Sequence, residues 1–230
     1  MAFVLIVVQQ MLRDSAKTFV QEVSAVAALR NLRDCGDEWS PELLSGMAEM
    51  GWTGITIPEQ YDGLEFGYVG AGLIVEECGR TLASAPLVST SLVCASLVAA
   101  LGSDAQKKEM LPAVASGELV LALALSENAA FDPLATELTA VPNDEGYVLS
   151  GAKVHVLDGG IAGKFIVVAR TTGTAGDKDG LSLFIVDREE DGLNVDPVLN
   201  ADSRRTAEIS FCSIRVSADA LLGNVGSAWQ

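Results

Sequence analysis

The spacing of hydrophobic residues divides the chain into a helical first half and a strand-rich second half. Before Gly117, apolar residues recur at intervals of three and four, as in the stripe Leu12, Ala16 and Phe19. This is the period of amphipathic helices. From Leu121 onward, apolar residues alternate with small or polar ones, which is the period of half-buried strands. The pattern therefore predicts a helical part followed by a β part.

Capping residues and stop signals set the expected helices after the first stripe. Ser40 precedes Pro41, which is the usual order of an N-cap and a first helical residue. Ser103 and Gln106 have the spacing of a capping box. Two glycines in one predicted helix, Gly70 and Gly72, favour a close helix neighbour there over a bound ligand. Four further helices are predicted. The first begins at Ser40-Pro41 and ends at Gly51, the second runs from Val69 to Leu82, the third runs from Leu87 to Leu101, and the fourth follows Ser103.

The second half predicts short antiparallel strands. The turn 143–146, Asn-Asp-Glu-Gly, lies between two alternating runs and indicates a hairpin. We expect Thr171–Gly180 to be exposed and mobile, because it offers nothing to bury. Strands of this kind are expected to close as a small barrel. The predicted strands after the run that starts at Leu121 are Thr136–Val141, Tyr147–Leu149, Val154–Leu157, Phe165–Arg170, Leu181–Val186 and Ala207–Val216.

The predicted fold class is α+β, an N-terminal all-α helical domain followed by an antiparallel β-barrel domain. Residues 1–117 form the predicted helical domain and residues 118–220 the barrel domain. Residues 221–230 are left over by this division.

Composition narrows the classes of partner. The 230 residues carry a net charge of -16 and one histidine, which argues against binding nucleic acid or anionic membranes. No segment is long and apolar enough to span a bilayer. Four cysteines without close spacing predict free thiols in a reducing cytoplasm, with no disulfide framework and no metal site. These cysteines are Cys35, Cys78, Cys94 and Cys212.

Several segments together resemble the acyl-CoA dehydrogenase family. The most specific is residues 51–63, Gly-Trp-Thr-Gly-Ile-Thr-Ile-Pro-Glu-Gln-Tyr-Asp-Gly, which is similar to the family's loop Gly-Trp-x-Gly-x-x-x-Pro-Glu-x-Tyr-Gly-Gly. The resemblance covers essentially the whole chain, but only the first two domains of the family. Other matching segments are residues 9–16, Gln-Gln-Met-Leu-Arg-Asp-Ser-Ala; residues 76–80, Glu-Glu-Cys-Gly-Arg; residues 146–153, Gly-Tyr-Val-Leu-Ser-Gly-Ala-Lys; and residues 183–187, Leu-Phe-Ile-Val-Asp.

The resemblance implies a site for FAD and an acyl thioester at the end of the first strand. Residues 123–132, Leu-Ala-Leu-Ser-Glu-Asn-Ala-Ala-Phe-Asp, match the family's strand and turn, with Asn128 and Ala129 in place of Pro-Gly. By position, Leu123, Leu125 and Ser126 match the strand along the flavin, and Ser126 offers a hydroxyl. Ala130 and Asp132 match the turn nearest the substrate.

A second flavin contact of the family, Lys-x-Trp/Phe-x-Thr/Ser-Asn/Asp-Gly, is altered in this chain. Residues 153–159 read Lys-Val-His-Val-Leu-Asp-Gly. His155 stands where an aromatic ring usually covers the flavin, and Leu157 replaces the hydroxyl that bonds the ring, which weakens the case for FAD. For His155, a hydrogen-bonded structural imidazole is favoured over a general base. Arg204 and Arg205 are equally interpretable as a phosphate contact or as a solvated pair.

The implied reaction is α,β-dehydrogenation of an acyl-CoA, with hydride transfer to FAD and electron-transfer flavoprotein as the acceptor. In the family a C-terminal helical domain carries the carboxylate base and much of the homo- or hetero-oligomer interface. We therefore expect residues 221–230 to begin that domain, assign no catalytic residue, and expect the 230-residue chain alone to be inactive.

Other functions stay open on the same sequence. The second interpretation is a non-catalytic, FAD-poor partner subunit of a hetero-oligomeric dehydrogenase, and an oxidase or flavin-dependent hydroxylase is less favoured. The acyl chain length, or a branched or steroid substrate, stays open as well.

Overall fold

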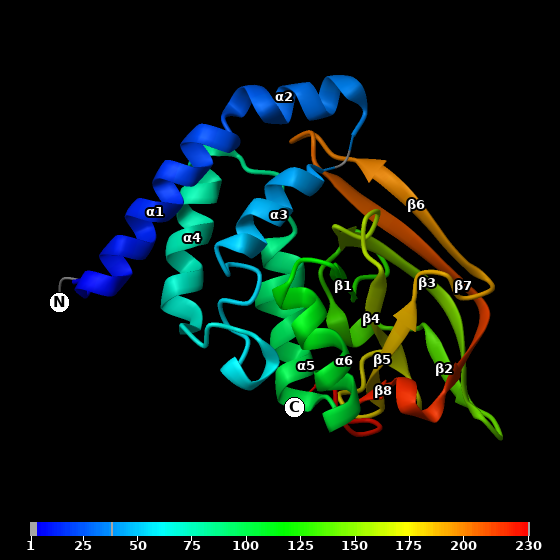
Figure 1. Cartoon of the computed structure of the whole chain (residues 1–230). Coiled ribbons are helices and arrows are strands. Elements are labelled where there is room, and N and C mark those ends of the chain that lie inside the picture. The colour runs from blue at the N-terminus through cyan, green and yellow to red at the C-terminus, as the bar shows by residue number, and fades with distance from the viewer. Residues whose placement is uncertain (1–3, 38, 230) are drawn as a thin grey trace.

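The computed structural model describes residues 4–37 and 39–229, and it places a helical layer against a curled sheet (Figure 1). The capping predictions are confirmed: Ser40 Oγ accepts the Leu43 N–H at 3.1 Å, and Ser103 and Gln106 form the capping box. The helices are α1 (Val7–Val23), α2 (Val26–Cys35), α3 (Pro41–Glu49), α4 (Gly67–Thr81), the π-helical segment η2 (Leu87–Cys94), α5 (Ala95–Leu101) and α6 (Asp104–Ala115), with a short 3-10 turn η1 (Glu59–Tyr61).

The second half of the chain forms one eight-stranded, mostly antiparallel sheet. Its order is β6-β7-β3-β2-β4-β5-β8, and β1 lies beside β4. Only β1 and β2 run parallel to β4. The strands are β1 (Leu121–Ala124), β2 (Thr139–Pro142), β3 (Gly146–Leu157), β4 (Lys164–Arg170), β5 (Leu181–Asp187), β6 (Leu193–Leu199), β7 (Arg205–Ser217) and β8 (Leu221–Leu222), with 3-10 turns η3 (Pro133–Ala135) and η4 (Ala218–Ala220).

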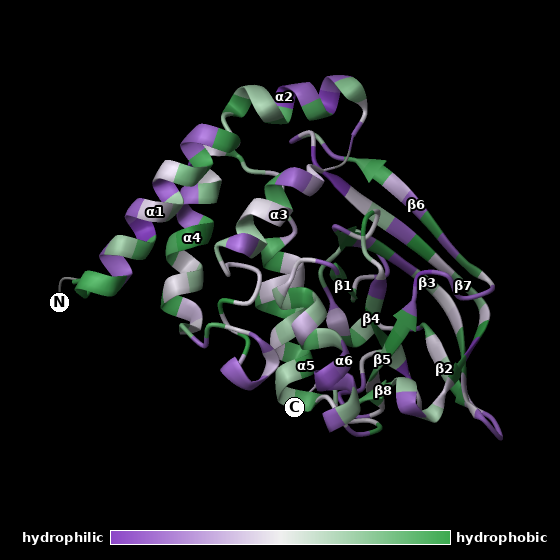
Figure 2. Cartoon of the chain, in the orientation of Figure 1, coloured by the Kyte–Doolittle hydropathy of each residue, from purple (hydrophilic) through white to green (hydrophobic). Residues whose placement is uncertain are grey.

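Strand β4 lies between two hydrophobic cores. Phe165 and Val167 point into the core enclosed by the curled sheet, where they meet residues of β3, β5 and β7. Ile166 and Val168 point to the other face, where η2, α5 and α6 cover the sheet. A strand buried on both faces reads as a continuous apolar run, as this one does. Figure 2 shows how the outer strand β6 differs from such a strand, because hydrophobic and hydrophilic residues alternate along it.

The predicted closed barrel is wrong, because the sheet stays open. Its two edge strands are β6, which pairs only with β7, and β8, which pairs only with β5. β8 has two residues, so it offers too few backbone groups to pair with the seven-residue β6. The helices already bury the outer face of β4 and β5, and the core is therefore covered without closure.

Apart from short 3-10 turns, three elements were not predicted, and two predicted regions differ in detail. α2, β6 and the two-residue β8 are the additions. The helix predicted from Leu87 to Leu101 is present, but η2 forms its first half with wider π-helical turns. The strands predicted at Tyr147–Leu149 and Val154–Leu157 belong to the single long strand β3.

Among the described residues, no helix combines the length and the apolar character that a membrane span requires.

Candidate functional site

The end of β1 is held between β3 and β4. β1 pairs in parallel with β4, and its continuation stays on β3, where the Val154 N–H donates to the Ser126 carbonyl at 2.8 Å. Leu123, Leu125 and Ser126 are half-buried. The three residues predicted along a flavin therefore lie at one strand end, where the backbone leaves the sheet.

A buried ion pair fixes the turn that follows this strand end. The ammonium of Lys153, a fully buried side chain, donates to Glu127 Oε1 at 2.7 Å and to the Leu125 carbonyl at 3.0 Å. The same carboxylate accepts the N–H groups of Glu137 at 2.7 Å and Leu138 at 3.0 Å. Glu127 thus closes the loop from β1 to β2. Burial lowers the pKa of Lys153, and its bond to Glu127 opposes that shift.

Segment η2 is bonded to both β1 and the end of β3. The Thr90 hydroxyl donates to the Leu121 carbonyl at 2.9 Å and accepts the Leu121 N–H at 3.1 Å. The Ser89 hydroxyl donates to Asp158 Oδ2 at 2.5 Å. Burial raises the pKa of Asp158, while the Ser89 bond and the Arg204 charge oppose the rise. Burial also raises the pKa of Cys94 to about 12, so this thiol stays protonated.

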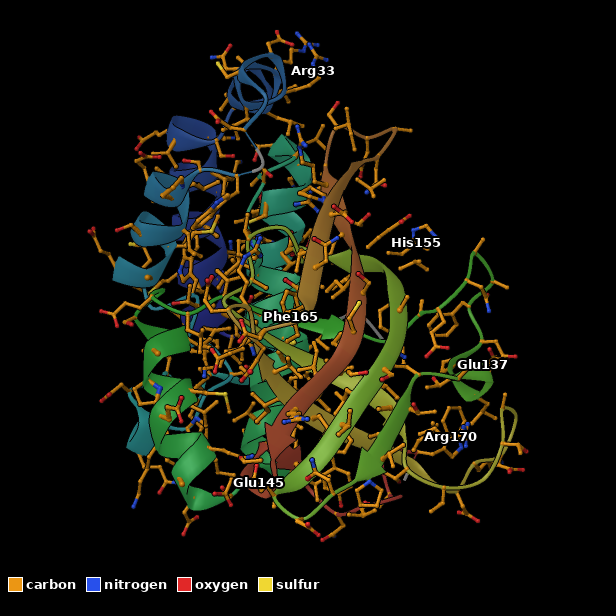
Figure 3. The ribbon with its side chains drawn as sticks, turned by 90° about the vertical axis from the view of Figure 1, so that its right-hand side faces the viewer. Arg33, Glu137, Glu145, His155, Phe165 and Arg170 are labelled. Atoms are coloured by element: carbon orange, nitrogen blue, oxygen red, sulfur yellow. The ribbon has the colours of Figure 1, made fainter. Side chains whose placement is uncertain are left out.

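His155 lies on an outward bulge of β3. Three residue steps from Lys153 to Val156 on β3 face only two on β7, and His155 takes the left-handed backbone (φ 54°) of the extra residue. Its side chain is exposed and points away from the sheet, whereas Phe165 lies in the middle of the molecule (Figure 3). Within the described part of the chain the His155 imidazole has no hydrogen-bond partner, so no described residue holds it as the predicted structural imidazole.

Leu157 lies in register with a hydroxyl on the neighbouring strand. It pairs with Thr206 on β7, and opposite residues of an antiparallel pair point to the same face. Thr206 Oγ1 is buried and has no partner among the described residues. Leu157, which carries no hydroxyl, therefore faces an unsatisfied hydroxyl across the ladder.

The turn residues and the arginine pair lie at the border of this region. Ala130 and Asp132 are exposed, and Asp132 Oδ1 accepts the Leu134 N–H at 3.2 Å. Arg204 donates to the Ala83 carbonyl at 2.9 Å, and Arg205 donates to the Gly36 carbonyl at 3.2 Å. Arg204 thus connects the turn between β6 and β7 to the helical layer, and Arg205 connects the start of β7 to it. No group of three or more potential metal-ligating side chains gathers in the described part of the chain.

Sequence reasoning missed Glu127, Lys153 and Asp158 as members of this site. All three occur in the two family-like segments, and that was the available signal. Their contacts join residues far apart in the chain: Glu127 is 26 positions from Lys153, and Ser89 is 69 from Asp158. Local patterns do not encode such contacts.

Two models of one protein family match consecutive parts of the chain. Residues 8–118 match the acyl-CoA dehydrogenase N-terminal domain, and residues 122–215 match the middle domain of the same family. A similar curated protein is the mitochondrial 2-methylacyl-CoA dehydrogenase of Solanum tuberosum, with 34% identity over 225 residues, 95% of this chain and 54% of that protein. The chain spans about half the length of the curated relatives it matches.

Solved structures are also similar to this chain, over its full length. The butyryl-CoA dehydrogenase of Megasphaera elsdenii superposes with a TM-score of 0.89 and 27% identity, over 100% of this chain and 62% of that one. An FAD complex of PigA superposes with a TM-score of 0.89 and 26% identity, over 100% of this chain and 61% of that one.

Proposed function

Because the chain belongs to the acyl-CoA dehydrogenase family, we propose that it acts as a flavoprotein in the α,β-dehydrogenation of an acyl-CoA thioester. The observation that carries the proposal is the strand end at Leu125 and Ser126, held rigidly by Lys153 and Glu127. A preorganised strand end costs little ordering when a ligand binds.

Bound FAD would supply the hydride acceptor for the β-hydrogen of the thioester, while a base takes the α-proton. In this proposal Leu123 and Leu125 lie along the flavin ring, and the Ser126 hydroxyl bonds its edge. Ala130 and Asp132 lie near the thioester. None of the described carboxylates is assigned as the base. Electron-transfer flavoprotein would take the electrons, and the protein would act as a homo- or hetero-oligomer.

The described residues fit FAD at one of the two expected contacts. The half-buried Ser126 hydroxyl bonds to no other described residue, so it is available to a ring atom. At the second contact, the Leu157 side chain carries neither a donor nor an acceptor, and the exposed His155 side chain points away from the sheet. The unsatisfied Thr206 hydroxyl lies beside Leu157 and is a candidate replacement.

This weaker second contact favours one alternative, a non-catalytic, FAD-poor subunit that stabilises a competent dehydrogenase partner. The two functions differ in whether the chain binds FAD at a defined site. Titrating FAD with the protein and following flavin fluorescence distinguishes them. The proposed function predicts saturable quenching with one FAD per chain.

Ser126→Ala should weaken FAD binding roughly 2- to 10-fold, because one net hydrogen bond is worth about 0.5–1.5 kcal/mol. Ser116→Ala, which alters an exposed serine at the end of α6, is the matched control and should bind FAD as wild type does. Quenching that never saturates would support the partner-subunit function instead.

Turnover of acyl-CoA with a dye acceptor should be absent for the 230-residue chain alone, and measurable turnover would require a base among its own carboxylates.

A further inference from the structure

A groove of about 360 Å³ lies where the helical layer meets the turn between β6 and β7. Apolar side chains line most of it, and Arg204 lies on its lining as the cation. Two of the apolar side chains are unusually open, with Leu82 53% exposed and Val88 41% exposed. Leu82 also takes a left-handed backbone (φ 57°), which is costly for a leucine. The groove has the size and the apolar lining of a small-molecule site.

Arg204 is the half-buried cation of this groove. Among the described residues, no carboxylate oxygen lies within 4.0 Å of its guanidinium. Its one side-chain bond to a described residue goes to the Ala83 carbonyl, which leaves most of its five N–H groups open. A half-buried, unpaired guanidinium beside apolar walls is best satisfied by a carboxylate, which it can bind in a bidentate manner.

Neither acidic group near Arg204 forms an ion pair with its guanidinium among the described residues. Asp202 also lines the groove, but its Oδ1 accepts the backbone N–H of Arg204 at 3.0 Å. Asp158 attracts Arg204 from a greater distance, and its Oδ2 accepts the Ser89 hydroxyl. Cys78, another lining residue, has its pKa raised to about 11 by burial and is therefore uncharged at neutral pH. Arg204 is the cation of the groove lining, and its side chain keeps N–H groups open beside the carboxylate of Asp202.

We propose that this groove binds an apolar ligand that carries a carboxylate, with the carboxylate paired to Arg204 and the carbon skeleton against Leu82, Leu87 and Val88. This deepens the proposed function, on which it rests for identifying the ligand as the acyl part of the substrate. A short chain of contacts connects the groove to the expected flavin contact. Val88 lines the groove, the adjacent Ser89 bonds Asp158, and Asp158 follows Leu157 at that contact. The predicted substrate class is an acyl group that bears a distal carboxylate.

Isothermal titration calorimetry at pH 7.5 with decanoate tests this, with decanol as the uncharged ligand of equal chain length. Wild type should bind decanoate saturably and bind decanol more weakly. Arg204→Met should weaken decanoate binding about tenfold or more, the loss expected for a charge-assisted hydrogen bond. Arg204→Met should leave decanol binding unchanged. Arg205→Met is the matched control, because Arg205 bonds the Gly36 carbonyl outside the groove, and it should bind both ligands as wild type does.

Val88→Trp adds bulk to the groove lining and leaves the Arg204 side chain in place, and it should abolish the binding of both ligands. It also keeps the proposal testable if Arg204→Met does not fold, as judged by circular dichroism. The proposal is overturned if decanoate does not bind, if decanol binds as tightly as decanoate, or if decanoate binding survives both substitutions. The titration contains neither flavin nor CoA, so its result is independent of the FAD titration.

Discussion

At the scale of single residues, we propose that positions 155 and 157 limit how tightly a flavin is held. We expect the purified protein to be colourless or nearly so, because Leu157 offers no hydrogen bond to the ring and the exposed His155 gives less contact area than a larger aromatic. Leu157→Thr combined with His155→Trp should raise the FAD retained after dialysis, measured by absorbance. One net hydrogen bond corresponds to about 0.5–1.5 kcal/mol, or up to roughly tenfold in affinity.

Leu157→Val is the control for the hydroxyl, because valine and threonine have nearly the same shape. Combined with His155→Trp, it should retain less flavin than the threonine double variant. Stoichiometric FAD in the dialysed wild-type protein would show that our interpretation of both positions is wrong.

Asp158 gives the stability of the fold a defined pH dependence. Burial raises its pKa above the usual aspartate value, so the folded protein holds this proton more tightly than the unfolded chain does. The stability it contributes is therefore present at acid pH and is lost as the pH rises through the raised pKa. Asp158→Asn keeps an acceptor for Ser89 and removes the buried charge. It should have a higher free energy of unfolding than wild type at pH 7.

The difference between Asp158→Asn and wild type should shrink as the pH falls toward 4, measured by urea denaturation at several pH values. Asn also tolerates the left-handed backbone of this residue (φ 57°), and that gain would be independent of pH. The pH-dependent part is thus the test. A gap that stays constant with pH would mean that the aspartate is not ionised at a cost in the folded protein.

Part of the site was predictable at the residue scale. The strand end at Leu125 and Ser126 follows from the alternating pattern and the family-like turn, and the structure places both residues there. The outward bulge at His155 did not follow, because it depends on a residue inserted relative to β7. Nor did the burial of Lys153, since a lysine on an alternating strand is expected to reach solvent unless it is paired.

At the scale of elements, the two glycines of α4 have different roles. A side chain on Gly70 would meet the ring of Phe66 and the Leu12 side chain of α1, so the expected close helix neighbour is present there. Gly72 is exposed and has open space around it. Gly72→Ala should therefore stabilise the protein by about 1 kcal/mol, because alanine favours the helix.

Gly70→Ala is the matched variant in the same helix and should destabilise the protein, because the steric conflict with Phe66 outweighs the same gain in helix propensity. Thermal unfolding followed by circular dichroism gives both values. Equal effects of the two substitutions would contradict the helix contact at Gly70.

The elements missed by sequence reasoning have a weak local signal. α2 has no fully buried residue, so its apolar stripe is shallow, although its end at Gly36 has the left-handed backbone (φ 82°) of a common helix stop. β6 is an edge strand interrupted by Pro197, which is tolerated where one side of the strand is unpaired. Whether the sheet closes depends on whether β6 pairs with β8, and only contacts between residues far apart in the chain decide that.

At the scale of the whole molecule, the helical layer and the sheet share a hydrophobic core. Leu111 and Val114 of α6 pack in the same cluster as Ile166 of β4 and Leu183 of β5. The junction between the layers is also bonded, since the Leu119 N–H donates to the Ala113 carbonyl at 3.0 Å and the Gly163 N–H to the Val120 carbonyl at 2.9 Å. Opening the junction would expose this core, so we expect the layers to unfold together.

Limited proteolysis tests this organisation, and the first cut should fall in the loop Thr171–Gly180 rather than at Gly117-Glu118. Most of this loop is exposed, as predicted, and its mobility stays a prediction. The Arg170 guanidinium bonds only to the C-terminal part of this loop, where it donates to the carbonyls of Asp177 at 3.3 Å and Asp179 at 3.2 Å. Trypsin should cut first after Lys178, which is exposed between these two residues, and mass spectrometry of the fragments identifies the site.

Lys178→Gln removes that tryptic bond and should delay the first cleavage without creating a cut near the junction. Subtilisin, which does not need a basic residue, should still cleave both proteins within Thr171–Gly180, because exposure and few buried contacts decide where a native chain opens. If either protease instead separates the chain at Gly117-Glu118 first, the shared core of α6, β4 and β5 does not hold the two layers together in solution.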